Sequence, residues 1–275
     1  MHGVDHQTMI VDIHVHISNP GNKRKSFFEV KDELLDSMKK QGIRYSIVIP
    51  DNFPNPQCAD MDTVFEILKD EKQLFALGTI NIFKDKEAHI VRLDNLLKTK
   101  KIHGIKLFPG HEPFYPTDKR CEPVYELCIE YGLPVVIHTG IQSENNTECA
   151  KYNDPKHIIK IAQKHPKLAV VIAHFFWPKM DYCYELTKDI ESIYYDTSAM
   201  ADPEVLEASG GFDKVRRILE KTVLRKPSNV VFGTDWPICS VRKHRELIKS
   251  LKVSQELKDK IFSLNAIKLY RLGIP

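Results

Sequence analysis

Short apolar runs rich in valine and isoleucine recur along the whole chain, and helical patterns separate them. Runs such as residues 47–49 and 170–172 are apolar on both faces, which is typical of parallel strands that helices cover on both sides. The pattern predicts eight strands, at residues 9–16, 43–50, 74–80, 102–108, 135–139, 168–174, 193–196 and 229–234.

The stretches between these runs carry apolar residues at helical spacing. In residues 28–41, for example, Phe28, Leu34, Leu35 and Met38 lie near one face of a helix. After the sixth strand, residues 178–188 give only a poor helical pattern. The remaining predicted helices are residues 61–69, 87–98, 123–131, 155–164, 203–206, 212–224, 244–251 and 255–272.

Eight strands that alternate with helices predict an α/β protein, a single (β/α)8 TIM barrel over residues 1–275, with its weakest unit after strand six. A chain of 275 residues can bury about three quarters of the surface that its unfolded form exposes, enough for one core. The alternative is a doubly wound open sheet, which normally has a glycine-rich phosphate loop after the first strand. Here no glycine follows His16 until Gly21, which favours the barrel.

The charge balance and hydropathy exclude other classes of protein. Forty Lys and Arg against 37 Asp and Glu leave a net charge of +3, too little to predict nucleic-acid binding. No run of 18 apolar residues could span a membrane, and residues 1–6 lack the features of a secretory leader. We therefore expect a cytoplasmic protein with a small-molecule partner, either as a monomer or as a homo-oligomer.

Polar side chains stand at the ends of several predicted strands. The first strand ends in His14 and His16, and later strands end in His138, His174 and Asp235. In a barrel these carboxyl ends meet at one mouth, where active sites are built. A lone histidine pair is more often solvated or hydrogen bonded, but the whole set indicates a site for a first-row divalent metal. Zinc is the default ion for several neutral imidazoles and one carboxylate.

These segments, in this order, resemble the amidohydrolase superfamily, and specifically its amidohydrolase-2 branch of metal-dependent hydrolases. The resemblance runs from about residue 9 to residue 272. It implies that one main metal, Zn²⁺ or alternatively Mn²⁺, is bound by His14, His16, His138 and Asp235, with His174 beside it. The matching segments are residues 11–16, 104–109, 132–140, 171–174, 195–198, 232–237 and 265–270.

Two residues of the fourth strand bear on the substrate contacts and on the number of metals. Many relatives have a histidine where this chain has Phe108, so one substrate contact is missing here. Some members of the superfamily carry a carbamylated lysine in this strand that bridges two metals, at the place of Lys106. In this branch the lysine is more often unmodified, and we therefore expect a site without a second metal.

The resemblance implies hydrolysis of an amide, ester or lactone by a water that the metal activates. Asp235 would move the proton and His174 would polarise the carbonyl. The alternative is a nonoxidative decarboxylase of an aromatic or unsaturated acid at the same site. A barrel with a degenerate, non-catalytic site is disfavoured, because every expected ligand position is filled. Substrate contacts are expected from Lys106, Phe108, His111, Tyr115, Trp177 and Trp236.

Overall fold

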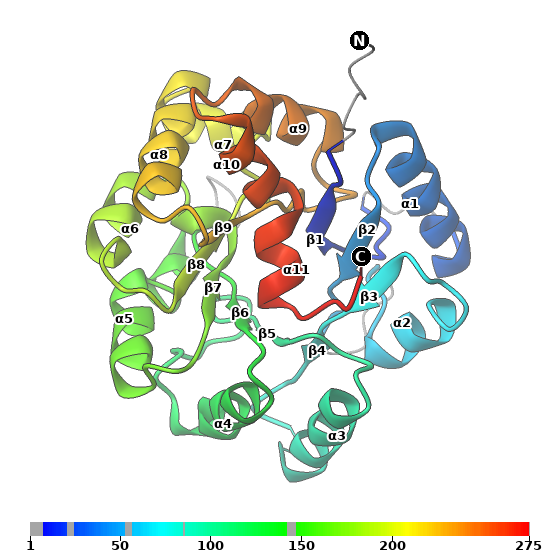
Figure 1. Ribbon diagram of the computed structural model, residues 1–275. Helices are drawn as coiled ribbons and strands as arrows, with labels where there is room; N and C mark the ends of the chain where they lie inside the picture. Colours follow the sequence, from blue (N-terminus) through cyan, green and yellow to red (C-terminus); the bar gives the residue numbers. More distant parts are fainter. Residues whose placement is uncertain (1–7, 21–24, 53–56, 85, 142–146, 275) are drawn as a thin grey trace.

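The computed structural model describes residues 8–20, 25–52, 57–84, 86–141 and 147–274 (Figure 1). Within these residues, parallel strands alternate with helices, and most of the helices lie outside the ring of strands. The strands are β1 (Val11–Val15), β2 (Tyr45–Val48), β3 (Leu74–Ala76), β4 (Gly78–Thr79), β5 (Ile105–Leu107), β6 (Val135–Ile137), β7 (Val170–Ile172), β8 (Ile193–Asp196) and β9 (Val230–Val231).

The third predicted strand, residues 74–80, is divided between two sheets. In the described residues the sheet orders are β1-β2-β3 and β4-β5-β6-β7-β8-β9. The amide of Leu77 donates to the carbonyl of Val48 at 3.0 Å, and the amide of Gly78 donates to the carbonyl of Gly104 at 2.9 Å. The single predicted strand is therefore two short pieces, because the chain changes its hydrogen-bonding partner between them.

The first and last strands are also joined by backbone hydrogen bonds. The amide of Ile13 donates to the carbonyl of Phe232 at 3.0 Å, and the amide of His16 donates to the carbonyl of Trp236 at 2.8 Å. The two sheets are thus connected on both sides, and the predicted (β/α)8 barrel is confirmed.

A helix follows most of the strands. Residues 178–188, whose sequence gives a poor helical pattern, also contain a helix. This helix, α6 (Met180–Thr187), buries Met180, Cys183, Tyr184 and Thr187. These residues have helical spacing, but most of them are not aliphatic, which weakened the pattern in the sequence. The other helices are α1 (Phe27–Gln41), α2 (Met61–Ile67), α3 (Lys86–Lys98), α4 (Glu122–Tyr131), α5 (Pro155–Lys164), α7 (Pro203–Ala208), α8 (Phe212–Arg225), α9 (Val241–Ser250), α10 (Gln255–Asp259) and α11 (Asn265–Leu269).

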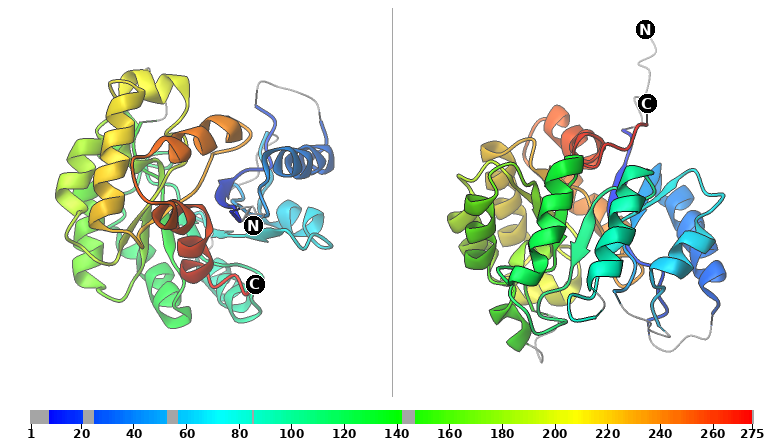
Figure 2. Two further views of the ribbon diagram at one scale, coloured as in Figure 1. Left: turned by 45° about the horizontal axis from the view of Figure 1, so that its top comes forward. Right: turned by 90° about the horizontal axis from the view of Figure 1, so that it is seen from below.

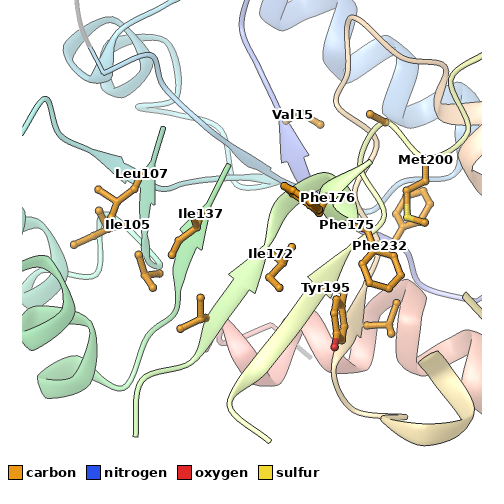
Figure 3. Packing of buried hydrophobic residues seen from close by; sticks show 14 of the residues in the cluster. Val15, Ile105, Leu107, Ile137, Ile172, Phe175, Phe176, Tyr195, Met200 and Phe232 are labelled. Carbon is orange, nitrogen blue, oxygen red and sulfur yellow. The ribbon is translucent and has the colours of Figure 1, made fainter. Parts of the chain in front are cut away.

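The core has an outer layer between strands and helices and an inner layer inside the barrel. Figure 3 shows Ile105, Leu107, Ile137 and Ile172 of neighbouring strands in the outer layer. The inner layer contains Tyr270 at the end of the C-terminal helical segment. In the views of Figure 2, α11 lies at one end of the barrel. The carbonyl of Tyr270, which follows α11, lies 2.8 Å from Nδ1 of His103, which precedes β5, so the strands begin at this end and their carboxyl ends lie at the other.

Every helix that the structure describes is too short or too polar to cross a membrane. The expectation of a cytoplasmic location rests partly on residues 1–6, and these lie outside the described residues. The location therefore stays a prediction.

Candidate metal centre

A bulge in β1 turns its two histidines toward the interior of the barrel. The register between β1 and β2 pairs Asp12 with Ser46 but Val15 with Val48, so β1 holds one extra residue. Such a bulge changes which side chains point inward. Ile13 packs in the inner layer and Val15 in the outer layer. The neighbours of Val15 in sequence, His14 and His16, therefore share the inner side, as predicted from their spacing.

His14, His16 and Asp235 form a compact group of side chains that could bind a metal. The Oδ1 atom of Asp235 lies 3.4 Å from Nε2 of His16 and 3.8 Å from Nε2 of His14. The Nδ1 atom of His16 lies 2.9 Å from the carbonyl oxygen of Ile49. A proton on Nδ1 satisfies that carbonyl and leaves the Nε2 lone pair of His16 free for a metal.

Two local features place the Asp235 carboxylate beside β1. The carboxylate of Asp12 accepts hydrogen bonds from the amide and the hydroxyl of Thr234, at 3.0 and 2.6 Å. Asp235 itself has a left-handed backbone, with φ of 70°, which is uncommon for a residue with a side chain. Such conformations cluster at functional sites because the surrounding structure must hold them in place.

The charges in this group favour a cation. Burial opposes ionisation of Asp235, but the hydrogen bond with His16 holds the pKa of its carboxyl well below the usual range. Burial lowers the pKa of His16, but Asp235 and Cys58 outweigh it and raise that pKa to about 10. The Asp235 carboxylate thus stabilises positive charge at the position that it shares with the two imidazoles.

Asp196, at the end of β8, is a buried partner of His14 that the sequence analysis did not assign to the site. Its Oδ2 atom lies 2.6 Å from Nδ1 of His14. Its Oδ1 atom accepts hydrogen bonds from the amides of His174 and Ser198, at 2.9 and 3.1 Å. The signal in the sequence was its position at a strand end, which it shares with the predicted ligands.

Three further histidines, His174, His138 and His111, lie next to this group at the barrel mouth. The ring centroid of His174 lies 4.9 Å from that of His14 and 4.9 Å from that of His138. The Nε2 atom of His138 is 3.2 Å from Nε2 of His111. Burial lowers the pKa of His174 to about 3 and holds the pKa of His138 well below its usual range, so both rings are neutral.

The predicted ligand set is only partly gathered into one group. Among the described residues, the sets of three or more ligands whose donor atoms all lie within 4.8 Å of one another are His14–His16–Asp235 and His14–His174–Asp196. His138 is in neither set, although its ring neighbours that of His174.

Lys106 lies inside the barrel. It alternates on β5 with Ile105 and Leu107, which point outward, and only 1% of its surface is exposed. Burial lowers the pKa of its amine to about 8, against the charges of Asp196 and Asp235. Within the described residues, its Nζ atom has no hydrogen-bond partner.

A cavity of about 270 Å³ opens at the cluster. Of the expected substrate contacts, His111 and Trp177 line it, and Phe108 packs near His111 with ring centroids 5.8 Å apart. Tyr115 is 42% exposed and packs against other rings, and neither it nor Trp236 is among the lining residues that the structure describes. The lining residues are His111, His138, Ile141, His174, Trp177, Ala199, Asp202, Glu204, Val205, Asp235, Ile238 and Cys239.

Solved structures resemble this fold over nearly its whole length. An uncharacterised TIM-barrel protein from Bordetella bronchiseptica has a TM-score of 0.76 and 19% identity, covering 96% of this chain and 99% of that chain. A protein from Pseudomonas putida assigned as a 2-pyrone-4,6-dicarboxylic acid hydrolase has a TM-score of 0.70 and 16% identity, covering 98% and 99%. At these identities the likeness shows the fold.

A third structure is a dihydroxybenzoic acid decarboxylase from a Polaromonas species with bound manganese and 2-nitroresorcinol. Its TM-score is 0.68 at 13% identity, and the match covers 98% of both chains. No curated protein matches the chain. The family model for amidohydrolases, in contrast, matches residues 11–272. The match covers nearly the whole chain, and the protein belongs to the amidohydrolase family.

Proposed function

We propose that this protein is a metal-dependent hydrolase that cleaves an amide, ester or lactone bond in a small molecule. One observation carries the proposal: the Asp235 carboxylate lies beside Nε2 of both His14 and His16 and lines the cavity. Two imidazoles and a carboxylate are a ligand set for a catalytic first-row metal, which keeps a position open for water or substrate.

The residues fit one divalent cation. We propose that His14, His16 and Asp235 hold it, with His138 as a further ligand. Zn²⁺ and Mn²⁺ both suit these donors, and manganese is bound in the Polaromonas decarboxylase. We propose that Lys106 is not carbamylated, so that it does not bridge two metals, and that the site holds a single metal.

The reaction would use the residues of the cavity as follows. The cation, when bound, acidifies a water and polarises a carbonyl oxygen. Asp235 accepts the proton of the attacking water and returns it to the leaving group. His174, whose Nδ1 atom lies 2.9 Å from the hydroxyl of Ser198, stabilises the negative charge that develops on the carbonyl oxygen.

The cavity limits the size and character of the substrate. At about 270 Å³ it is smaller than the roughly 300–1,000 Å³ of most ligand pockets, which favours a compound with a single ring or a short acyl group. Trp177 and Ile141 supply apolar surface, whereas Asp202 and Glu204 add acidic groups. The buried charge of Lys106 near Asp235 favours an anionic group close to the metal.

Decarboxylation of an aromatic or unsaturated acid is the second candidate, and the likeness to the Polaromonas enzyme favours it. In that reaction the metal would bind the substrate's carboxylate, and Asp235 or His174 would handle the proton.

The two reactions differ in the fate of water. Metal-loaded protein is incubated with small lactones, esters, amides and aromatic acids in ¹⁸O-labelled water. Hydrolysis predicts one ¹⁸O atom in the acid product and no carbon dioxide, whereas release of carbon dioxide with no ¹⁸O in the organic product would replace our proposal with decarboxylation. Asp235→Asn should lose more than about 100-fold in turnover. The surface variant Asp213→Asn is the matched control, since Asp213 is exposed on α8.

A further inference from the structure

Ser198, which follows β8, connects the carboxylate of Asp196 to the ring of His174. Its Oγ atom forms a hydrogen bond with Oδ1 of Asp196 and lies 2.9 Å from Nδ1 of His174. All three side chains are buried. Bulk water therefore does not compete for these contacts, and the direction of each hydrogen bond is decided within the group.

The proton of the Ser198 hydroxyl points to Asp196. A hydroxyl has one proton to donate, and a carboxylate oxygen only accepts. The Oδ1 atom of Asp196 already accepts hydrogen bonds from the amides of His174 and Ser198, at 2.9 and 3.1 Å. If the hydroxyl donated to His174 instead, lone pairs of Oγ and Oδ1 would face each other at hydrogen-bonding distance. The hydroxyl therefore donates to Asp196 and accepts from Nδ1–H of His174.

This direction fixes the position of the proton on His174. A neutral imidazole that carries its proton on Nδ1 has a lone pair on Nε2. The ring of His174 lines the cavity, and its Nδ1 atom is taken up by Ser198. We propose that Ser198 is a positioning residue that holds His174 as the Nδ1–H tautomer, so that Nε2 meets the substrate as a hydrogen-bond acceptor.

The same contacts account for the second group of possible metal ligands, His14, His174 and Asp196, whose donor atoms lie within 4.8 Å of one another. The Nδ1 atom of His14 lies 2.6 Å from Oδ2 of Asp196, and Nδ1 of His174 donates to Ser198. Protons occupy these positions, so this group orients two imidazoles and does not bind an ion.

An acceptor in the cavity wall selects among substrates. A buried lone pair is costly to leave without a donor, so the best substrates carry a hydroxyl or N–H group beside the scissile carbonyl. In the reaction proposed above, on which this inference rests, that donor also supplies the proton that His174 needs before it can stabilise the carbonyl oxygen. The donor's bond to hydrogen breaks, its electron pair stays on the donor atom, and the Nε2–H bond forms. The proton returns to the donor when the product leaves.

Nitrogen NMR reports the tautomer and does not depend on turnover. Full-length protein labelled with ¹⁵N-histidine is measured metal-free and with Zn²⁺, and the signals of His174 are identified by their loss in His174→Gln. A protonated ring nitrogen and one with a lone pair resonate far apart. We expect Nδ1–H in the wild type, a shift towards Nε2–H in Ser198→Ala, and the wild-type signals in Ser198→Thr, which keeps the hydroxyl. Ser46→Ala, at another buried serine, is the matched control and should match the wild type.

A pair of substrates tests the acceptor. A hydroxylated ester or lactone that the protein turns over is compared with its O-methyl ether, which has lost the donor. The wild type should show a kcat/KM about 10- to 100-fold lower for the ether. In Ser198→Ala the two compounds should differ by less than about threefold, because Nε2 is then protonated and no longer accepts.

The outcomes separate this inference from the proposed function. An Nε2–H tautomer in the wild type, a zinc-bound frequency at Nε2 of His174, or equal tautomers in the wild type and folded Ser198→Ala overturns the role of Ser198 and leaves the site of His14, His16 and Asp235 standing. Equal rates for the hydroxylated compound and its ether overturn the acceptor role of Nε2. A wild type without zinc binding or turnover overturns the proposed function, and the spectra of the metal-free protein still decide the tautomer.

Discussion

The Oδ2 atom of Asp196 lies 2.6 Å from Nδ1 of His14, and both side chains are buried. Burial opposes the charge on Asp196, but the hydrogen bond with Nδ1 of His14 holds the pKa of its carboxyl well below the usual range. A carboxylate at Nδ1 keeps the proton on that atom and the lone pair on Nε2, the atom that faces Asp235. The β8 strand thus orients an imidazole that β1 supplies.

Replacing this carboxylate should weaken metal binding without unfolding the protein. In Asp196→Asn, the side-chain oxygen would keep accepting hydrogen bonds from the amides of His174 and Ser198. The side-chain NH₂ would then face Nδ1 of His14 and donate to it. The proton of His14 then moves to Nε2. We expect a loss of metal affinity of about 10- to 100-fold, measured by chelator competition. The control Asp189→Asn, at an exposed ion pair, should bind as the wild type does. Equal affinities in all three proteins would contradict the orienting role.

Gly233 is predicted to be indispensable for the position of His14. A Cβ atom at residue 233 would lie 2.9 Å from the Cβ of His14, closer than packed side chains approach. Gly233→Ala should lower the free energy of unfolding by about 1–3 kcal/mol and should also weaken metal binding, since β1 must shift. Gly42→Ala is the control, because Gly42 has a left-handed φ of 68° but open space around it. This substitution should lower the free energy of unfolding by about 1 kcal/mol and leave metal binding unchanged. Urea denaturation and metal titration check both variants.

Glu112 should make the protein less stable as the pH rises. Burial raises the pKa of this carboxyl from 4.5 to about 7, while the side chain of Asn52 donates a hydrogen bond to it. Between these two pH values the unfolded chain has lost the proton that the folded chain retains, so the free energy of unfolding falls with rising pH. Glu112→Gln removes this penalty. The free energy of unfolding of Glu112→Gln minus that of the wild type should increase by about 1–3 kcal/mol from about pH 4.5 to 7. Above pH 7 this difference should stay constant.

Denaturation curves across this range provide the measurement. The control is Glu130→Gln on the exposed side of α4, for which a constant difference from the wild type is expected. A Glu112→Gln advantage that does not change with pH would show that the carboxyl ionises alike in both states.

The barrel could be predicted from the sequence because its strands are apolar on both faces and regularly spaced. The division of residues 74–80 into β3 and β4 could not, since it depends on which neighbouring strand each amide meets. The helix α6 was underrated because cysteine, tyrosine and threonine occupy its buried positions. Both differences arise from tertiary contacts, which a local pattern does not contain.

The sequence indicated that three of the four predicted ligands would lie close together, but it did not predict their geometry. His14, His16 and Asp235 meet as expected, because parallel strands bring their carboxyl ends together. The bulge in β1, which directs the two histidines inward, leaves no mark in the alternation of residues. The burial of Lys106 and the approach of His111 to His138 likewise depend on loops and layers that form only in the folded chain.

Metal titration tests the central claim most directly. Zn²⁺ and Mn²⁺ are titrated calorimetrically into metal-free protein purified without a histidine tag, using the wild type, His16→Asn and Asp235→Asn, with circular dichroism to verify folding. The account predicts one tightly bound ion per wild-type chain and a loss of affinity of more than about 100-fold in each variant, because each one removes a direct ligand. Folded variants that bind either ion as tightly as the wild type, or a wild type that binds neither, would contradict it.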